Sequence, residues 1–168
     1  ASNLHLNLPD LPSSIKKKLS AAYPRLSPHN PLDILGDAAP EDIATTLNVF
    51  KQDASRISNL MTIITPQTTT KPLATAQAII DSGIHKKLPL YTVFIGGEKM
   101  VKAKQLLRRN HLLTFDFPTQ ALDIIAAKSR YEIDRHKIPV FPATKPNYLT
   151  RQDKTILDKK LQQPLVLT

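Results

Sequence analysis

The sequence predicts an α/β fold in which a parallel sheet is covered by helices on both faces. Short β-rich runs alternate with amphipathic segments of about ten to fifteen residues, the spacing at which a helix returns the chain and pairs successive strands in parallel. Several of these segments also begin with proline in the first turn, and one is followed by glycine, as α-helices often are.

The alternation of strand and helix can be followed from residue 11 to residue 135. The expected elements are a helix in 11–24, a strand at 31–35, a helix in 39–53, a strand at 59–65, a helix in 71–83, a strand at 88–95, a helix in 96–110, a strand at 112–115 and a helix at 118–135.

In the first half of the chain, local signals define each element. The first helix has Ser13 or Ser14 as its expected N-cap and Pro24 beyond its end. The run "PLDIL" predicts the strand at 31–35. The helix after it has Pro40 in its first turn, followed by two carboxylates that favour the positive end of the helix dipole. Its expected buried face holds Ile43, Leu47 and Phe50.

In the second half, "NLMTIIT" predicts a buried strand, and the helix after it runs from Pro72 to a C-terminal glycine cap at Gly83. "LPLYTVFI" predicts the next strand, and "LLTF" the one after it. The helix between them should bury Met100, Ala103, Leu106 and Leu107, and the last helix begins at Pro118.

The last 33 residues differ in character from the rest. "KIPVFPATKPNYLT" contains three prolines and predicts an extended arm, and "RQDKTILDKKLQQ" predicts one more helix, capped by Thr150. We therefore expect a folded domain at 1–135 and a linker or arm at 136–168.

Composition excludes several classes of function. With no cysteine, the chain has no disulfide, no thiol nucleophile and no cysteine metal site. It has no apolar run near the roughly 20 residues that cross a membrane and no signal-peptide layout, so a cytoplasmic location is expected. The net charge of +9 raises nucleic acid as a partner, but the basic residues are scattered and not interleaved with aromatic ones, which favours a solvated basic surface.

Candidate ligand-binding loops follow the expected strands, because ligands of doubly wound sheets bind beyond the carboxyl ends of the strands. "GDAAP" and "GGEK" carry three of the four glycines, and their backbone N–H groups at a helix start suit an anion. The candidate anion-binding residues are Gly36, Asp37, Ala38, Gly96 and Gly97. Ordinary turn chemistry explains the same glycines, and both interpretations stay open.

A third loop, "TPQTTTKP", is rich in side-chain hydroxyls that can hydrogen-bond an oxyanion. The alternative is that its threonines cap the following helix, with Thr70 as the expected cap. We find no metal-ligand spacing among the five histidines, and no catalytic Ser-His-Asp pattern, P-loop or GxGxxG. No catalytic residue and no metal site are therefore assigned.

Three motifs occur in a fixed order: "NPLDILGDAAPEDIATTL", "TIITPQTTTKPLATAQAI" and "YTVFIGGEKMVKAKQLLRRNHLLTFDFPTQALDIIAAKSRYE". Together, between about residues 28 and 133, they resemble a CoA-ligase domain of NDP-forming acyl-CoA (acetyl-CoA) synthetases, relatives of succinyl-CoA synthetase. The same domain occurs in bacterial protein lysine acetyltransferases that are fused to a synthetase-like module.

The resemblance implies a flavodoxin-like, succinyl-CoA synthetase-like fold and a role in an acid–thiol ligase. Such enzymes make acyl-CoA from acid, CoA and nucleotide through an acyl phosphate and a phosphohistidine that lies in another domain. CoA, ATP or ADP, and Mg would be cofactors of the full-length protein and not of this domain. The residues expected near the substrate are Asn30, Asp33, Thr65, Pro66, Gln67 and Thr68.

The sequence departs from the family in two respects. The family's domain begins with a strand and a glycine-rich turn, whereas residues 1–25 resemble only the segment after that turn, so we expect the usual first strand to be missing. The arm resembles a connection toward an ATP-grasp domain but carries no ATP-grasp motif. The implied partners are the CoA-binding, phosphohistidine and ATP-grasp domains of the same synthetase, with a homo-oligomer also possible, and the chain alone should be inactive.

The alternative hypothesis is a free-standing flavodoxin-like module that binds flavin or another small anion. It is disfavoured because Pro66 interrupts the loop that would bind the flavin phosphate and because the chain has no tryptophan to stack on a flavin.

Overall fold

The computed structural model describes residues 4, 6–34, 38–68 and 70–135. The chain divides into two units, Ala1–Tyr131 and Glu132–Thr168. The expected arm and its final helix lie outside the described residues. No helix in the described part of the chain is both long and apolar enough to span a bilayer.

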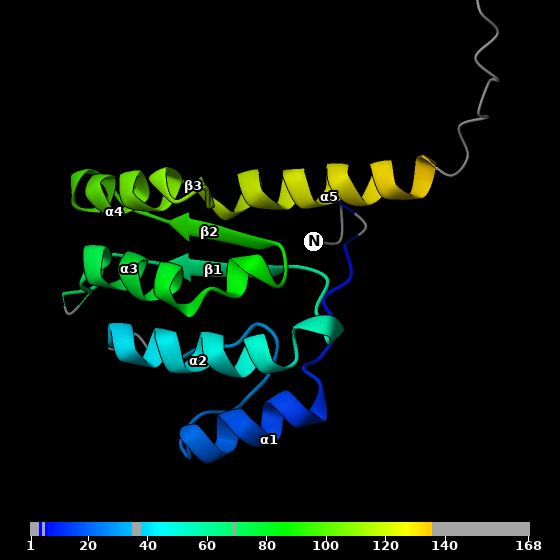
Figure 1. The fold of residues 1–168 in the computed structure, drawn as a ribbon, viewed down its shortest axis with the longest axis horizontal. Helices are drawn as coiled ribbons and strands as arrows, with labels where there is room; N and C mark the ends of the chain where they lie inside the picture. The colour runs from blue at the N-terminus through cyan, green and yellow to red at the C-terminus, as the bar shows by residue number, and fades with distance from the viewer. Residues whose placement is uncertain (1–3, 5, 35–37, 69, 136–168) are drawn as a thin grey trace, which may run out of the picture. The chain divides into compact units, whose positions relative to one another are not determined.

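The centre of the first unit is a parallel sheet of three strands (Figure 1). β1 spans Leu60–Ile64, β2 spans Leu90–Phe94 and β3 spans Leu113–Phe115, in the order β1-β2-β3. Thr62, Thr92 and Thr114 lie side by side across the three strands. The parallel α/β prediction is therefore confirmed.

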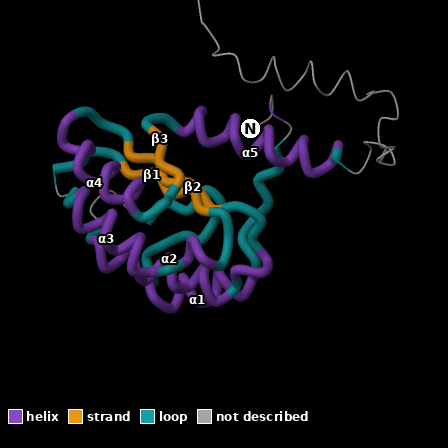
Figure 2. The backbone as a smooth tube through the Cα atoms, turned by 45° about the horizontal axis from the view of Figure 1, so that its top comes forward, coloured by secondary structure: helices purple, strands orange, loops and turns teal. Residues whose placement is uncertain are grey.

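Five α-helices and two short 3-10 helices accompany the sheet in the described residues. They are α1 (Ser13–Ala22), α2 (Pro40–Gln52), η2 (Ala54–Arg56), α3 (Pro72–Ser82), η3 (Ile84–Lys86), α4 (Glu98–Arg109) and α5 (Pro118–Asp134). Figure 2 shows them around the strands, with α1 and α2 beyond α3.

The larger core lies on the face of the sheet that α3 and α4 cover. Leu90 and Phe94 of β2 are buried there, together with Ile79 of α3 and Leu107 of α4. The same core continues away from the sheet between α1 and α2, which bury the apolar stripes expected from their periodicity. In α4 the predicted positions Met100, Ala103 and Leu107 are fully buried, whereas Leu106 is partly buried.

The opposite face of the sheet carries a smaller core under α5. Tyr91 and Val93 of β2 pack there with Ala121 and Ile125 of α5. Because successive residues of a strand point to opposite faces, β2 is buried on both sides, as the uninterrupted apolar run "LYTVF" predicts. Helices on both faces of the sheet are thus confirmed.

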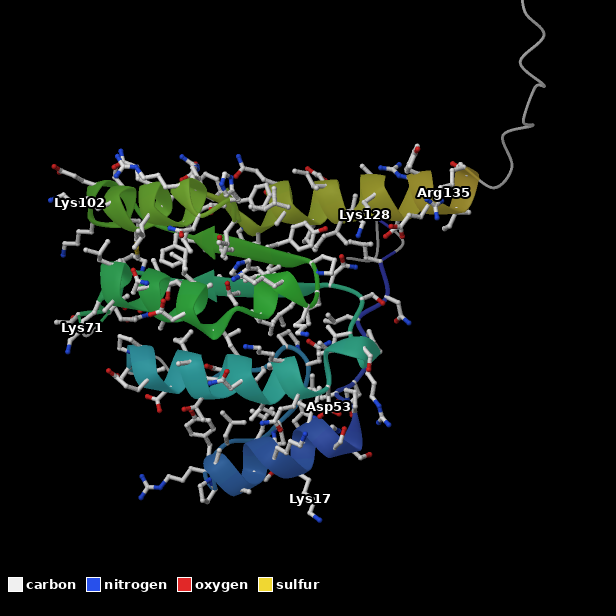
Figure 3. The ribbon with its side chains drawn as sticks, viewed as in Figure 1. Lys17, Asp53, Lys71, Lys102, Lys128 and Arg135 are labelled. Carbon is white, nitrogen blue, oxygen red and sulfur yellow. The ribbon has the colours of Figure 1, made fainter. Side chains whose placement is uncertain are left out.

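A salt bridge joins α1 to the end of α2. Lys18 Nζ lies 2.9 Å from Asp53 Oδ2, and Asp53 is seen next to α1 in Figure 3. The hydrogen bond from Lys18 lowers the pKa of the Asp53 carboxyl. Helix ends also follow the sequence signals in part: Gly83 has the left-handed φ of +62° expected for a C-terminal cap.

Two local predictions were wrong. Residues 31–34 do not form a strand, and residue 35 lies outside the described residues. Leu32 and Ile34 instead pack their side chains on the larger core. A strand requires a neighbour that accepts its backbone hydrogen bonds, and the three-stranded sheet places none beside this segment. The N-cap of α1 is Pro12, with no side-chain cap, instead of Ser13 or Ser14.

His85 in η3 should make stability depend on pH near neutrality. Burial, then the charges of Lys86 and Lys51, lower its pKa, and its Nδ1 is buried without a hydrogen-bond partner among the described residues. The unfolded chain therefore binds the extra proton first, so stability is full above about pH 6.5 and falls as the pH drops toward the folded-state pKa.

Urea unfolding at pH 7.5 and 5.5 checks this. We expect the loss of unfolding free energy between the two pH values to be smaller in His85→Gln than in the unmodified chain. His111→Asn is the control, because the His111 side chain is exposed and asparagine tolerates its left-handed backbone. Equal losses in the His85 variant and the unmodified chain would contradict the assignment.

Candidate functional site

The candidate site lies at the carboxyl edge of the sheet, where the strands hand over to α3, α4 and α5. The loop 65–71 follows β1, and the loop 95–97 follows β2. Because β1 and β2 are parallel neighbours, their loops leave the sheet at the same edge. Lys71 marks this edge in Figure 3, at the start of α3.

The structure brings the two loops into contact at Pro66 and Gly96. A Cβ atom added to Gly96 would lie 3.3 Å from Cγ of Pro66 and 3.2 Å from Cγ of Met100. Gly96 also has a φ of +131°, which side chains rarely adopt. Glycine is therefore required here both for the turn and for the approach of the β1 loop.

The loop after β1 is closed by the hydroxyl of Thr70. The Gln67 N–H donates to Thr70 Oγ1 at 2.9 Å, and the Thr70 hydroxyl donates to the Thr65 carbonyl at 3.1 Å. The prediction that Thr70 caps α3 was wrong: the N-cap is Lys71, without a side-chain hydrogen bond. The hydroxyl instead holds the loop in shape and leaves Thr65, Pro66, Gln67 and Thr68 exposed.

Replacing Thr70 with valine should loosen this loop. Two hydrogen bonds are lost, and we expect a fall of about 1–2 kcal/mol in unfolding free energy, together with faster amide exchange at Gln67. Thr68→Val is the matched control, because Thr68 is exposed and should change stability by less than about 0.5 kcal/mol. Denaturant unfolding and amide exchange measure the difference, and equal effects of the two variants would contradict the role of Thr70.

The helix starts at this edge differ in what remains for an anion. In α2 the Asp42 carboxylate accepts the Ala39 N–H at 2.8 Å, so the helix supplies its own negative group. In α3 and α4 no side chain caps the first turn, since the N-caps are Lys71 and Gly97. The first-turn N–H groups of α4 are thus open to an external acceptor, with Glu98 as the opposing charge beside them.

Charges around the edge are partly neutralised. Lys104 donates a hydrogen bond to Asp116 just after β3, and this bond lowers the pKa of the Asp116 carboxyl. Lys71 and Lys99 are exposed, and no ion pair between described residues involves either of them. Sequence reasoning did not select these two lysines, although each follows a selected loop directly, and that position was the available signal.

The remaining predicted residues lie before α2. Asn30 is engaged structurally, because its side-chain amide donates to the Pro9 carbonyl at 2.7 Å. Asp33 is exposed and Ala38 is partly buried. Gly36 and Asp37 lie outside the described residues, so the anion role predicted for Gly36–Ala38 stays a prediction.

A surface groove of about 470 Å³ lies elsewhere, between α2 and α3. None of the predicted site residues lines it. Its walls are Pro40, Glu41, Ala44, Asn48, Lys51, Ala74, Gln77, Ala78, Asp81 and Ser82.

Comparison with known proteins identifies a relative. The "Acetate--CoA ligase [ADP-forming] I" of Archaeoglobus fulgidus is 28% identical over 103 residues, which are 61% of this chain and 14% of the ligase. The chain is a homologue of that ADP-forming ligase. No family model matches the sequence. The homology confirms the resemblance to the acetyl-CoA synthetases, whereas the fused acetyltransferase stays a prediction.

Solved structures agree with this homology at the level of the fold. The dinucleotide-forming acetyl-coenzyme A synthetase 1 of Candidatus Korarchaeum cryptofilum matches with a TM-score of 0.72 in complex with phosphate and ADP and 0.73 in the apo form. Both matches have 20% identity and cover 80% of this chain and 30% of the synthetase. A protein of Pyrococcus horikoshii OT3 matches at a TM-score of 0.66 and 24% identity, over 75% of this chain and 30% of that one.

The ligase homologue therefore has the α/β fold of a CoA-ligase domain of ADP-forming synthetases. It spans about one-seventh of the curated ligase and about a third of the solved synthetase chains.

Proposed function

We propose that this chain is one domain of an ADP-forming acyl-CoA synthetase and that its carboxyl-edge loops bind the phosphate of an acyl phosphate. The observation that carries the proposal is the contact of the Pro66 loop with Gly96, at the start of an uncapped helix, in a homologue of an ADP-forming acetate–CoA ligase. One synthetase of the same fold was solved with phosphate and ADP.

The chemistry proposed for the chain's own residues is binding and orientation. The backbone N–H groups at Gly97 and Glu98 would donate to phosphate oxygens, and Lys71 would add a positive charge. The exposed Thr65 and Thr68 hydroxyls would lie toward the acyl end of the ligand. Proton transfer and phosphoryl transfer would be carried out by groups of other domains.

The remaining parts of the proposal concern the longer protein. It would use CoA, adenine nucleotide and Mg, place its phosphohistidine and ATP-grasp domains against this one, and act in the cytoplasm. Fusion to an acetyltransferase is the variant arrangement. We also propose that the isolated chain does not make acetyl-CoA from acetate, CoA and ATP.

A titration with inorganic phosphate at constant ionic strength tests the anion site. In an ¹⁵N-labelled sample, the amide signals of Gly96, Gly97 and Glu98 should move together along one saturable curve. Lys71→Ala should weaken binding by about threefold to tenfold, the effect of losing one charge-assisted contact.

Lys87→Ala is the matched control, because Lys87 is equally an exposed lysine but precedes β2 at the opposite edge of the sheet. Phosphate shifts that spread over the basic surface and respond equally to both variants would reject the site.

A further inference from the structure

The outer edge of β1 carries unpaired backbone groups. Leu60 N–H donates to Pro89, and Ile95 N–H donates to Ile64, each at 2.9 Å. In a parallel ladder these bonds direct both polar groups of residues 60, 62 and 64 toward β2. The N–H and C=O groups of Met61 and Ile63 therefore point away from the sheet, and no hydrogen bond between described residues reaches them.

The other edge of the sheet is protected. β3 is only three residues long, and the same alternation leaves Thr114 as its outward residue. The Thr114 carbonyl accepts a hydrogen bond from Arg108 Nη2 at 3.5 Å. Short length and a nearby charge are the usual means by which an edge strand avoids pairing, and β1 has neither of them.

The β1 edge is uncharged although the chain has a net charge of +9. From Asn59 to Thr70 the sequence contains no Asp, Glu, Lys, Arg or His. On the α5 face of the sheet, Ile63 is 50% exposed, and Met61 beside it is partly buried. An uncharged apolar partner fits this edge, because a charged one would lose its hydration without gaining an ion pair.

The threonine row specifies one side chain of that partner. On the α3/α4 face, Thr92 Oγ1 hydrogen-bonds to Thr114 Oγ1 at 3.0 Å and to the Leu113 carbonyl at 2.9 Å. Thr62 is next in this row, and its buried Oγ1 has no partner among the described residues. A neighbouring strand with a hydroxyl or amide side chain opposite Thr62 would complete the row.

The arrangement of the helices excludes a second copy paired edge to edge. α2 packs against α3 and α1, and both α1 and α2 lie on the β1 side of the sheet, past α3 (Figures 1 and 2). A two-fold axis at β1 would bring the α2 helix of the other copy into the space of α3. The edge can accommodate one extended strand that brings no helix of its own on this face.

We infer that the β1 edge binds an extended, uncharged strand of another polypeptide, which pairs with Met61 and Ile63 and places a hydroxyl-bearing or amide side chain opposite Thr62 between apolar neighbours. Backbone hydrogen bonds provide the affinity, and the side chain opposite Thr62 provides selectivity.

Amide hydrogen exchange of the full chain, with and without a peptide, tests this inference. The probe is an acetylated peptide of sequence NLMTIIT, followed by two lysines for solubility, since it combines apolar residues with a central threonine. In the dilute chain alone, the Met61 and Ile63 amides should exchange at least about tenfold faster than the Thr62 amide, which bonds to β2. Saturating peptide should slow exchange at Met61 and Ile63 to the rate of Thr62.

Two variants with equal exposure sharpen the test. Ile63→Lys puts a charge on the β1 edge and should weaken peptide binding by about tenfold or more. Leu113→Lys, also 50% exposed and on the same face of the sheet but in β3, should leave binding unchanged. A peptide with valine in place of threonine should bind about twofold to fivefold more weakly to the unmodified chain.

Three outcomes would overturn the inference. Slow exchange at Met61 and Ile63 in the dilute chain alone would mean that the chain covers its own edge. Protection that grows with protein concentration would mean pairing of two copies. Fast exchange that peptide does not slow would mean that the edge binds no strand.

Discussion

Replacing Phe94 with alanine is expected to lower the unfolding free energy by about 3–5 kcal/mol, the range for deleting a buried aromatic side chain. Phe94 lies at the end of β2 and is 0% exposed in the larger core, where the sheet meets α3 and α4. Its ring fills space that alanine leaves empty, and β2, paired on both sides, has little freedom to move inward.

Urea denaturation measures the effect, and Phe117→Ala is the matched control. Phe117 is 59% exposed just after β3, so the same chemical change there should cost less than about 0.5 kcal/mol. Similar losses at the two positions would show that Phe94 is not enclosed as described.

Gly96→Ala is expected to lower the unfolding free energy by about 2–4 kcal/mol, through strain at a φ of +131° and crowding against Pro66 and Met100. Because the crowding pushes on the loop after β1, the variant should also broaden or shift the amide signals of Thr65 to Thr68. Phosphate affinity should fall with it if the two loops form one site.

Gly97→Ala provides the comparison, because a Cβ at Gly97 would meet nothing within 4 Å. Its effect on stability should be clearly smaller than that of Gly96→Ala. If both variants unfold at the same urea concentration, Pro66 does not approach Gly96 in solution.

Much of the fold could be predicted because its signals are local. The apolar stripe of α2, the proline at the start of α3 and the glycine after it depend only on neighbouring residues, and all three predictions are confirmed. The strand expected at 31–35 failed for the opposite reason. Its apolar residues do pack on the core, but whether they form a strand depends on a hydrogen-bonding neighbour that no local pattern supplies.

The candidate site shows the same division. The sequence placed two loops at the carboxyl edge of the sheet because parallel strands end there. It could not show that Pro66 touches Gly96 or that Thr70 closes its own loop, since both depend on side-chain packing across segments. The two exposed lysines were overlooked because lysine is common in this basic chain.

The unequal cores on the two faces of the sheet imply an order of disassembly. α5 is held on the sheet by a small set of contacts centred on Ala121 and Ile125, whereas the helices opposite share one large core. Under mild destabilisation α5 should undock first and uncover Tyr91 and Val93 while α1–α4 stay assembled. Such a partly open species presents a bare apolar sheet, which makes it the form most susceptible to proteolysis and aggregation.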